Sequence, residues 1–102
     1  MTDELRERLA NDVHRVDWRP LAPHAKRGGL VLVDVALDLV EVAVAVARDD
    51  SEHVRRWMDA GQLLKPTSAQ IERWRNETQD RFSVVIVQPY VLAQRDTRAA
   101  YG

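Results

Sequence analysis

The chain contains no cysteine among its 102 residues. Disulfide bonds, thiolate chemistry and metal ligation by sulfur are therefore excluded. Glycine and proline are sparse, at four residues each, and the adjacent glycines Gly28 and Gly29 precede an expected strand rather than a helix, so there is no phosphate-binding loop. There is also no internal repeat, long linker or low-complexity segment, and we expect a single domain.

Neither sign of charge is in large excess, because 15 basic and 16 acidic residues give a net charge of −1. This composition provides no global attraction to nucleic acid or to an anionic membrane. The longest apolar region, residues 30–47, contains Asp34, Asp38 and Glu41. Each carboxylate would cost about 2.5–3.5 kcal/mol at a bilayer centre, so the region is not expected to span a membrane. The charged N-terminus lacks the apolar segment of a signal peptide, which indicates a cytoplasmic protein.

Residues 1–28 are expected to form two helices. In the first, Leu5, Leu9 and Val13 recur every four residues, as on one face of an amphipathic helix. The second is a short helix over residues 18–27, which a glycine ends.

The valines of the next segment alternate with other residues, at positions 31, 33 and 35 and then at 40, 42, 44 and 46. β-branched residues at a period of two are typical of strands, so we expect a hairpin with its turn near residues 36–38. A helix over residues 38–48 is the alternative, because Asp38 and Glu41 have the spacing of a capping box.

The rest of the chain is expected to contain two helices and a central strand. The first helix runs to Ala60, with Val54, Trp57 and Met58 facing inward, and the second begins after Pro66. Residues 81–94 are expected to form the strand, with a bulge or a change of direction at Pro89. Residues 30–94 would thus hold the hairpin, both helices and this strand, and residues 95–102 a tail. The fold class is α+β, with a valine-rich, mainly antiparallel sheet of three to four strands and helices packed on it.

Six residues are candidates for a ligand site or an interface. Asp38 and Glu41 could act in acid–base or metal chemistry with Lys65 nearby, although the same carboxylates could instead cap a helix or pair with a base. Three large aromatic side chains could line a pocket, form an interface or fill the core: Trp57, Trp74 and Tyr90. No histidine spacing indicates a metal site, and the serines lack a catalytic context. We therefore assign no catalytic residue, metal or cofactor.

Residues 54–75 have the outline of a helix-turn-helix, in which Arg73 and Arg75 would reach DNA. The connection over residues 61–67 is longer than the usual turn of three to four residues, and the second helix also carries acidic residues. Nucleic-acid binding therefore remains an alternative rather than the leading hypothesis.

Several segments together resemble one small bacterial family, domain of unknown function 2288. They are HAKRGGLVLV, LDLVEVAVAVARDD, the sequence WMDAGQLLKPTS and VIVQPYVLAQ. The resemblance extends from about residue 5 to residue 94 and implies an uncharacterised single-domain protein with no catalytic residues to transfer.

The leading hypothesis is a small non-enzymatic binding or interaction module that acts as a homodimer. It rests on the apolar strands and tryptophans of a short chain that carries no catalytic constellation. Two alternatives remain open: an enzyme that uses small molecules or metals around Asp38 and Glu41, and a nucleic-acid-binding protein that uses residues 54–75. No membrane partner is expected.

Overall fold

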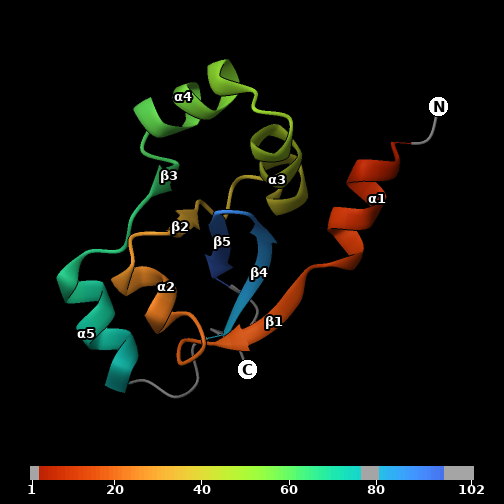
Figure 1. Cartoon of the computed structure of the whole chain (residues 1–102). Coiled ribbons are helices and arrows are strands. Elements are labelled where there is room, and N and C mark those ends of the chain that lie inside the picture. The colour runs from red at the N-terminus through yellow and green to blue at the C-terminus, as the bar shows by residue number, and fades with distance from the viewer. Residues whose placement is uncertain (1–2, 77–80, 96–102) are drawn as a thin grey trace.

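Helices lie on both faces of a five-stranded sheet in the computed structural model, which describes residues 3–76 and 81–95 (Figure 1). The elements in chain order are α1 (Glu4–Asn11), β1 (His14–Asp17), α2 (Ala22–Lys26), β2 (Leu30–Val33), α3 (Leu39–Ala47), α4 (Ser51–Asp59), β3 (Leu63–Leu64), α5 (Ser68–Asn76), β4 (Arg81–Val87) and β5 (Tyr90–Arg95). No helix in these two ranges is long and apolar enough to cross a membrane. The expected tail falls almost entirely outside the described residues.

The sheet has the strand order β1-β4-β5-β2-β3. Neighbouring strands are antiparallel except β2 and β5, which run parallel with Leu30 opposite Val91. The expected α+β class is confirmed, but the sheet is larger than the three to four strands expected and it is mixed. The parallel partners β2 and β5 are far apart in the chain, because three helices and two other strands lie between them.

The apolar segment over residues 81–94 forms two strands rather than one. β4 ends at Val87 and β5 begins at Tyr90, and these two residues face each other across the turn. The turn contains Gln88 and Pro89, so of the two expected outcomes at Pro89, a bulge or a change of direction, the structure shows the change of direction. β5 is the centre of the sheet, and its Val91, Leu92 and Ala93 are buried.

The expected strand over residues 39–47 is wrong, because this segment is the helix α3. The Asp38 carboxylate accepts hydrogen bonds from the backbone N–H of Val40 at 2.9 Å and of Glu41 at 3.3 Å, which caps the helix. Since every residue from 39 to 47 except Glu41 is apolar, the segment offers an apolar face to a helix as readily as to a strand. Tertiary packing then outweighs the low helix propensity of its valines.

The N-terminal part also differs from the expected pair of helices. The first helix is confirmed as α1, and its Leu9 is buried. His14 begins the unexpected strand β1, which pairs with β4 at the edge of the sheet. Its four residues, HRVD, are mostly polar, as is common on an edge strand, and so gave little strand signal. The second helix is shorter than expected, and α2 ends at Lys26 before Gly28 in a left-handed conformation (φ 81°).

The two later helices follow the sequence pattern closely. Asp50 caps α4 through the backbone N–H of His53, and Gly61 (φ 73°) follows the end of the helix. Trp74 is the buried residue of α5. Met58 does not face inward, however: it is 58% exposed, because α4 touches the rest of the molecule along one narrow side.

The core is divided between the two faces of the sheet. On one face, α1, α3 and α4 cover a cluster that includes Val42, Val85 and Leu92. On the other face, α2 and α5 cover a second cluster that includes Leu30, Phe82 and Trp74. Alternate residues of β4 and β5 point to opposite clusters, as the two-residue period of a strand requires.

The loop that joins β2 to α3 is fastened to the sheet by one side chain. Gln94 Nε2 donates hydrogen bonds to the carbonyl oxygens of Asp34 at 2.9 Å and of Leu37 at 2.7 Å. A single amide therefore fixes the point at which the chain leaves the sheet and enters α3.

Replacing Gln94 with alanine should lower the free energy of unfolding by about 1–3 kcal/mol, because two hydrogen bonds to a partly buried side chain are lost. Replacement with glutamate should cost more at neutral pH, since a carboxylate oxygen would face two carbonyl oxygens. Urea unfolding of the three proteins measures the order. Equal stability of the alanine variant and the parent would contradict the fastening role.

Candidate functional site

Asp38, the first candidate of the acidic set, has a structural role. Besides capping α3 it accepts a hydrogen bond from Arg6 Nη2 at 3.2 Å, which ties α1 to the start of α3. A second ion pair, between Arg48 Nη2 and Asp3 Oδ2 at 2.9 Å, links the same two helices. The Asp38 carboxylate is therefore engaged by two backbone donors and a guanidinium.

Glu41 and Lys65 do not join Asp38 in one site. Glu41 lies in the first turn of α3 with its side chain exposed to water, so nothing around it marks it as a general base. The Lys65 ammonium lies beside Gly28 at the end of α2, where it is 3.8 Å from the position of a Cβ added there. Because α2 and α3 cover opposite faces of the sheet, the residues expected to act together are separated by the sheet itself.

The aromatic candidates are also dispersed. Trp57 is half-buried on α4, where it packs against the cluster beneath α3, and Tyr90 is 45% exposed at the start of β5. Trp74 is buried under α5 on the other face. Of the six candidates, Lys65 and Trp74 alone lie on the side of α2 and α5.

The histidines occupy three separate places. His14 is on the edge strand β1 rather than in the helix expected there, His24 Nδ1 lies 2.8 Å from Arg27 Nη2 in α2, and His53 is on α4. Within residues 3–76 and 81–95, no group of three or more histidine, aspartate or glutamate side chains is placed to hold a metal ion.

Asp50 and His53 form a local pair at the start of α4. The Asp50 carboxylate accepts from the backbone N–H of His53 at 3.3 Å and lies 2.7 Å from His53 Nδ1. The backbone hydrogen bond, aided by the His53 ring and the Arg56 charge, lowers the pKa of Asp50 below its usual value of 3.8. The carboxylate therefore favours the folded state above pH 3.8, and that contribution is lost as the pH falls through the lowered pKa.

Asp50→Asn should make the protein less stable at neutral pH, and the difference from the parent should shrink as the pH falls below about 4. Asparagine still caps a helix, so this variant isolates the charge. Asp59→Asn, at the other end of α4, is the control. Urea midpoints between about pH 6 and pH 3 measure the effect. A difference that stayed constant with pH would contradict the assignment.

The helix-turn-helix outline over residues 54–75 is not formed. β3 lies between α4 and α5 and pairs with β2, with Leu32 opposite Leu64. Figure 1 shows α4 and α5 at opposite ends of the molecule. The two helices therefore do not pack as a DNA-reading unit.

A groove of about 1000 Å³ lies between α2 and α5. Its apolar lining comes from α2 and from the inner side of α5, through Ala22, Pro23, Ala25 and Ile71. Proline and alanine in α2 leave space next to α5, because they do not project far enough to meet it. A groove of this size falls within the range of small-molecule sites.

The inner wall of the groove is a group of aromatic side chains. Trp18 and Trp74 line it, with ring centroids 5.1 Å apart, and Phe82 packs edge-on against Trp74 at 5.3 Å. Trp74 is 2% exposed, and its indole Nε1–H has no hydrogen-bond partner among the described residues. A buried N–H without an acceptor is unusual, because an unmade hydrogen bond of this kind costs about 1–3 kcal/mol.

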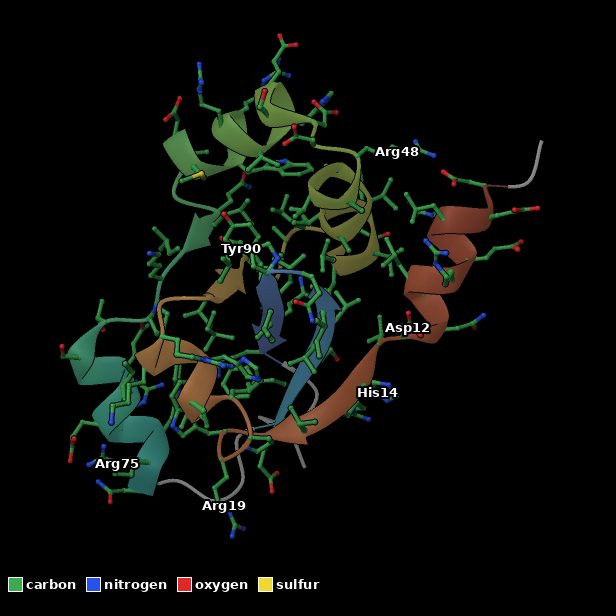
Figure 2. The ribbon with its side chains drawn as sticks, viewed as in Figure 1. Asp12, His14, Arg19, Arg48, Arg75 and Tyr90 are labelled. Atoms are coloured by element: carbon green, nitrogen blue, oxygen red, sulfur yellow. The ribbon has the colours of Figure 1, made fainter. Side chains whose placement is uncertain are left out.

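Charged side chains surround the opening of the groove. Arg19, Lys26 and Arg75 contribute three positive charges, and Asp17 contributes one negative charge. Figure 2 shows Arg19 and Arg75 extending outward at the end of the molecule where α2 and α5 meet. Arg75 has a long ion pair with Glu72, at 3.7 Å between exposed groups, which holds it weakly.

The groove belongs to a basic side of a strongly polarised molecule. Residues 14–29 and 63–76, which supply β1, α2, β3 and α5, carry seven basic and two acidic side chains, a net charge of +5. Residues 3–13 and 34–62, which supply α1, α3 and α4, carry five basic and eleven acidic side chains, a net charge of −6. A chain with almost no net charge thus carries its basic excess in the segments that hold α2 and α5, and its acidic excess in those that hold α1, α3 and α4.

Arg19 and Lys26 were not predicted as site residues from the sequence. Their signal is present, because Arg19, Pro23 and Lys26 are spaced by four and three and so share one side of a helical segment. The uneven distribution of charge was not recognised in the sequence for another reason. The two basic segments are separated in the chain by an acidic one, and they come together only in the folded protein.

Comparison with known proteins agrees with this fold. The family model described as "Protein of unknown function (DUF2288)" matches residues 4–95. The NMR solution structure of PA1075 from Pseudomonas aeruginosa is 36% identical and has a TM-score of 0.78, with 95% of this chain and 89% of that chain covered. No curated protein matches the chain significantly. The resemblance noted in the sequence is confirmed, and the chain belongs to the DUF2288 family.

Proposed function

We propose that this protein is a non-enzymatic binding module that takes a negatively charged ligand on its basic side. The observation that carries the proposal is the uneven distribution of charge, from −6 in the segments that hold α1, α3 and α4 to +5 in those that hold β1, α2, β3 and α5. Surfaces of one sign raise the local concentration of ligands of the other sign. An anion is therefore drawn toward α2 and α5 and away from the opposite face.

The arrangement of the acidic candidates favours binding over catalysis. Asp38 is occupied as a helix cap, Glu41 is exposed, and Lys65 lies beyond the sheet from both. A general acid–base pair must come within hydrogen-bond reach of one substrate, and these residues do not.

The test is a titration of the isotope-labelled protein with sodium tripolyphosphate, a compact polyanion, followed by backbone amide NMR shifts. We expect the shifts to concentrate in α2 and α5 and to weaken strongly when salt is raised from about 50 to 200 mM, because the screening length shortens. Shifts that are absent, or that spread equally over α3 and α4, would overturn the proposal.

The homodimer expected from the sequence stays a prediction. It is supported by two exposed apolar side chains on the hairpin of β4 and β5, Ile86 and Tyr90, which are 56% and 45% exposed. Sedimentation equilibrium should give twice the monomer mass for the parent chain and a reduced dimer fraction for Ile86→Lys. A strict monomer at micromolar concentrations would contradict it. The cytoplasmic location likewise stays a prediction.

A further inference from the structure

We propose that the groove between α2 and α5 holds an amphipathic anion, a small molecule with an apolar body and one anionic head. The proposal deepens the proposed function and rests on it. It names the part of the basic side that holds the ligand and the chemical class of that ligand.

The apolar body is indicated by the floor of the groove. Ala22, Ala25 and Ile71 are half-buried there, and Pro23 completes the lining. None of these side chains offers a hydrogen bond, so a compact inorganic anion would gain nothing from entering the floor. A hydrocarbon or aromatic body would instead remove this apolar surface from water.

The anionic head is indicated by the rim. Arg19, Lys26 and Arg75 leave a positive excess over the single carboxylate of Asp17. The head would lie at the opening, where arginine and lysine donors can meet a carboxylate, sulfonate or phosphate oxygen. The long side chains also leave room for the ligand to enter, because Arg19 and Arg75 extend away from the body of the molecule (Figure 2).

The unpaired indole N–H of Trp74 is a second, independent indication of a ligand. Trp74 lines the groove, is 2% exposed and has no acceptor for its Nε1–H among the described residues. Trp74 is the buried side chain of its helix, α5, and it belongs to the wall of the groove that a ligand would contact. An acceptor atom on the ligand would then complete a hydrogen bond that the protein alone leaves unmade.

The experiment compares three probes that separate charge from apolar surface. They are 8-anilinonaphthalene-1-sulfonate, the amphipathic anion; N-phenyl-1-naphthylamine, which has the same body without the sulfonate; and tripolyphosphate, which has charge without an apolar body. We expect the sulfonate to bind at least about tenfold more tightly than either of the others. In the parent protein it should also move the Trp74 indole N–H resonance downfield and leave the Trp57 resonance in place.

Matched variants locate the site. Lys26→Ala should weaken sulfonate binding several-fold, whereas Arg55→Ala, which removes an exposed cation from α4, should leave it unchanged. Trp74→Phe keeps an aromatic ring, removes the N–H and should also weaken binding. The indole resonance of the parent protein tests the same contact if the Trp74 variant fails to fold.

The outcomes separate this inference from the proposed function. Equal affinity for the sulfonate and the uncharged amine would overturn the amphipathic anion. Tripolyphosphate could shift the amide resonances of α2 and α5 while the sulfonate binds no more tightly than tripolyphosphate. That result would overturn the groove as the site, and the proposed function would stand. Absence of binding by both anions would overturn both. If the Trp74 indole N–H resonance does not move when the sulfonate is added, Trp74 does not contact the ligand.

Discussion

Replacing Phe82 with alanine should lower the free energy of unfolding by about 3–5 kcal/mol. Phe82 has no exposed surface, and it packs against both Trp74 and Trp18, with ring centroids 5.3 and 6.1 Å away. Its removal would leave a cavity between β4 and the two tryptophans that the rigid sheet cannot close. Urea or thermal unfolding measures the loss, which is a large part of the stability of a domain this size.

The matched control is Ile86→Ala. Ile86 lies on the same strand and the same side of the sheet as Phe82, four residues later, but is 56% exposed. We expect it to cost less than about 1 kcal/mol. Similar losses for the two variants would mean that α2 and α5 do not cover the sheet as described.

A charge placed at Ala43 should destabilise the protein almost as severely. Ala43 has no exposed surface beneath α3, so Ala43→Asp would bury an unpaired carboxylate, at a cost of about 3–5 kcal/mol. Ala47→Asp, one turn later at the exposed C-terminal end of α3, should cost less than about 1 kcal/mol.

This pair of variants tests whether α3 packs on the sheet as described. Ala43 belongs to the core cluster, whereas Ala47 is exposed at the end of the helix. Equal losses of stability would contradict this packing, and chemical unfolding measures both variants under the same conditions.

The sequence predicted those elements whose ends carry their own signals. Asp50 and Gly61 mark the start and the end of α4 close to the expected residues. Both signals are local, because one is a capping carboxylate and the other a left-handed glycine. Pro89 likewise predicted the reversal between β4 and β5. None of these signals depends on which part of the chain packs against which.

Elements defined by their neighbours were predicted poorly. The residues of α3 are apolar in nearly every position, so the period of two in its valines competed with the capping signal of Asp38, and packing against the sheet decides between them. The strand β1 is largely polar, and it is a strand because it pairs with the edge of β4. The parallel pairing of β2 with β5 brings together segments about sixty residues apart.

The candidate site was predicted only in part, because it too depends on which segments of the chain pack together. Trp74 was identified as one of three large aromatic side chains that could line a pocket, and it does line the groove. Arg19 and Lys26 were missed, because the groove forms only when α2 and α5 meet on one face of the sheet. Asp38 and Glu41 were predicted as site residues from the sequence. In the structure, Asp38 caps α3 and Glu41 is exposed to water.

The central claim is that the basic side is the working surface of the protein. Its most direct test is the tripolyphosphate affinity of two charge-reversed proteins with equal net charge, Lys26→Glu with Arg75→Glu and, as the control, Arg55→Glu with Arg56→Glu on α4. We expect the first pair to abolish binding at about 50 mM salt and the control pair to retain most of it, because screening confines the effect of a charge to about 10–14 Å at this ionic strength. Equal losses in the two proteins, or full affinity in the first, would contradict the claim.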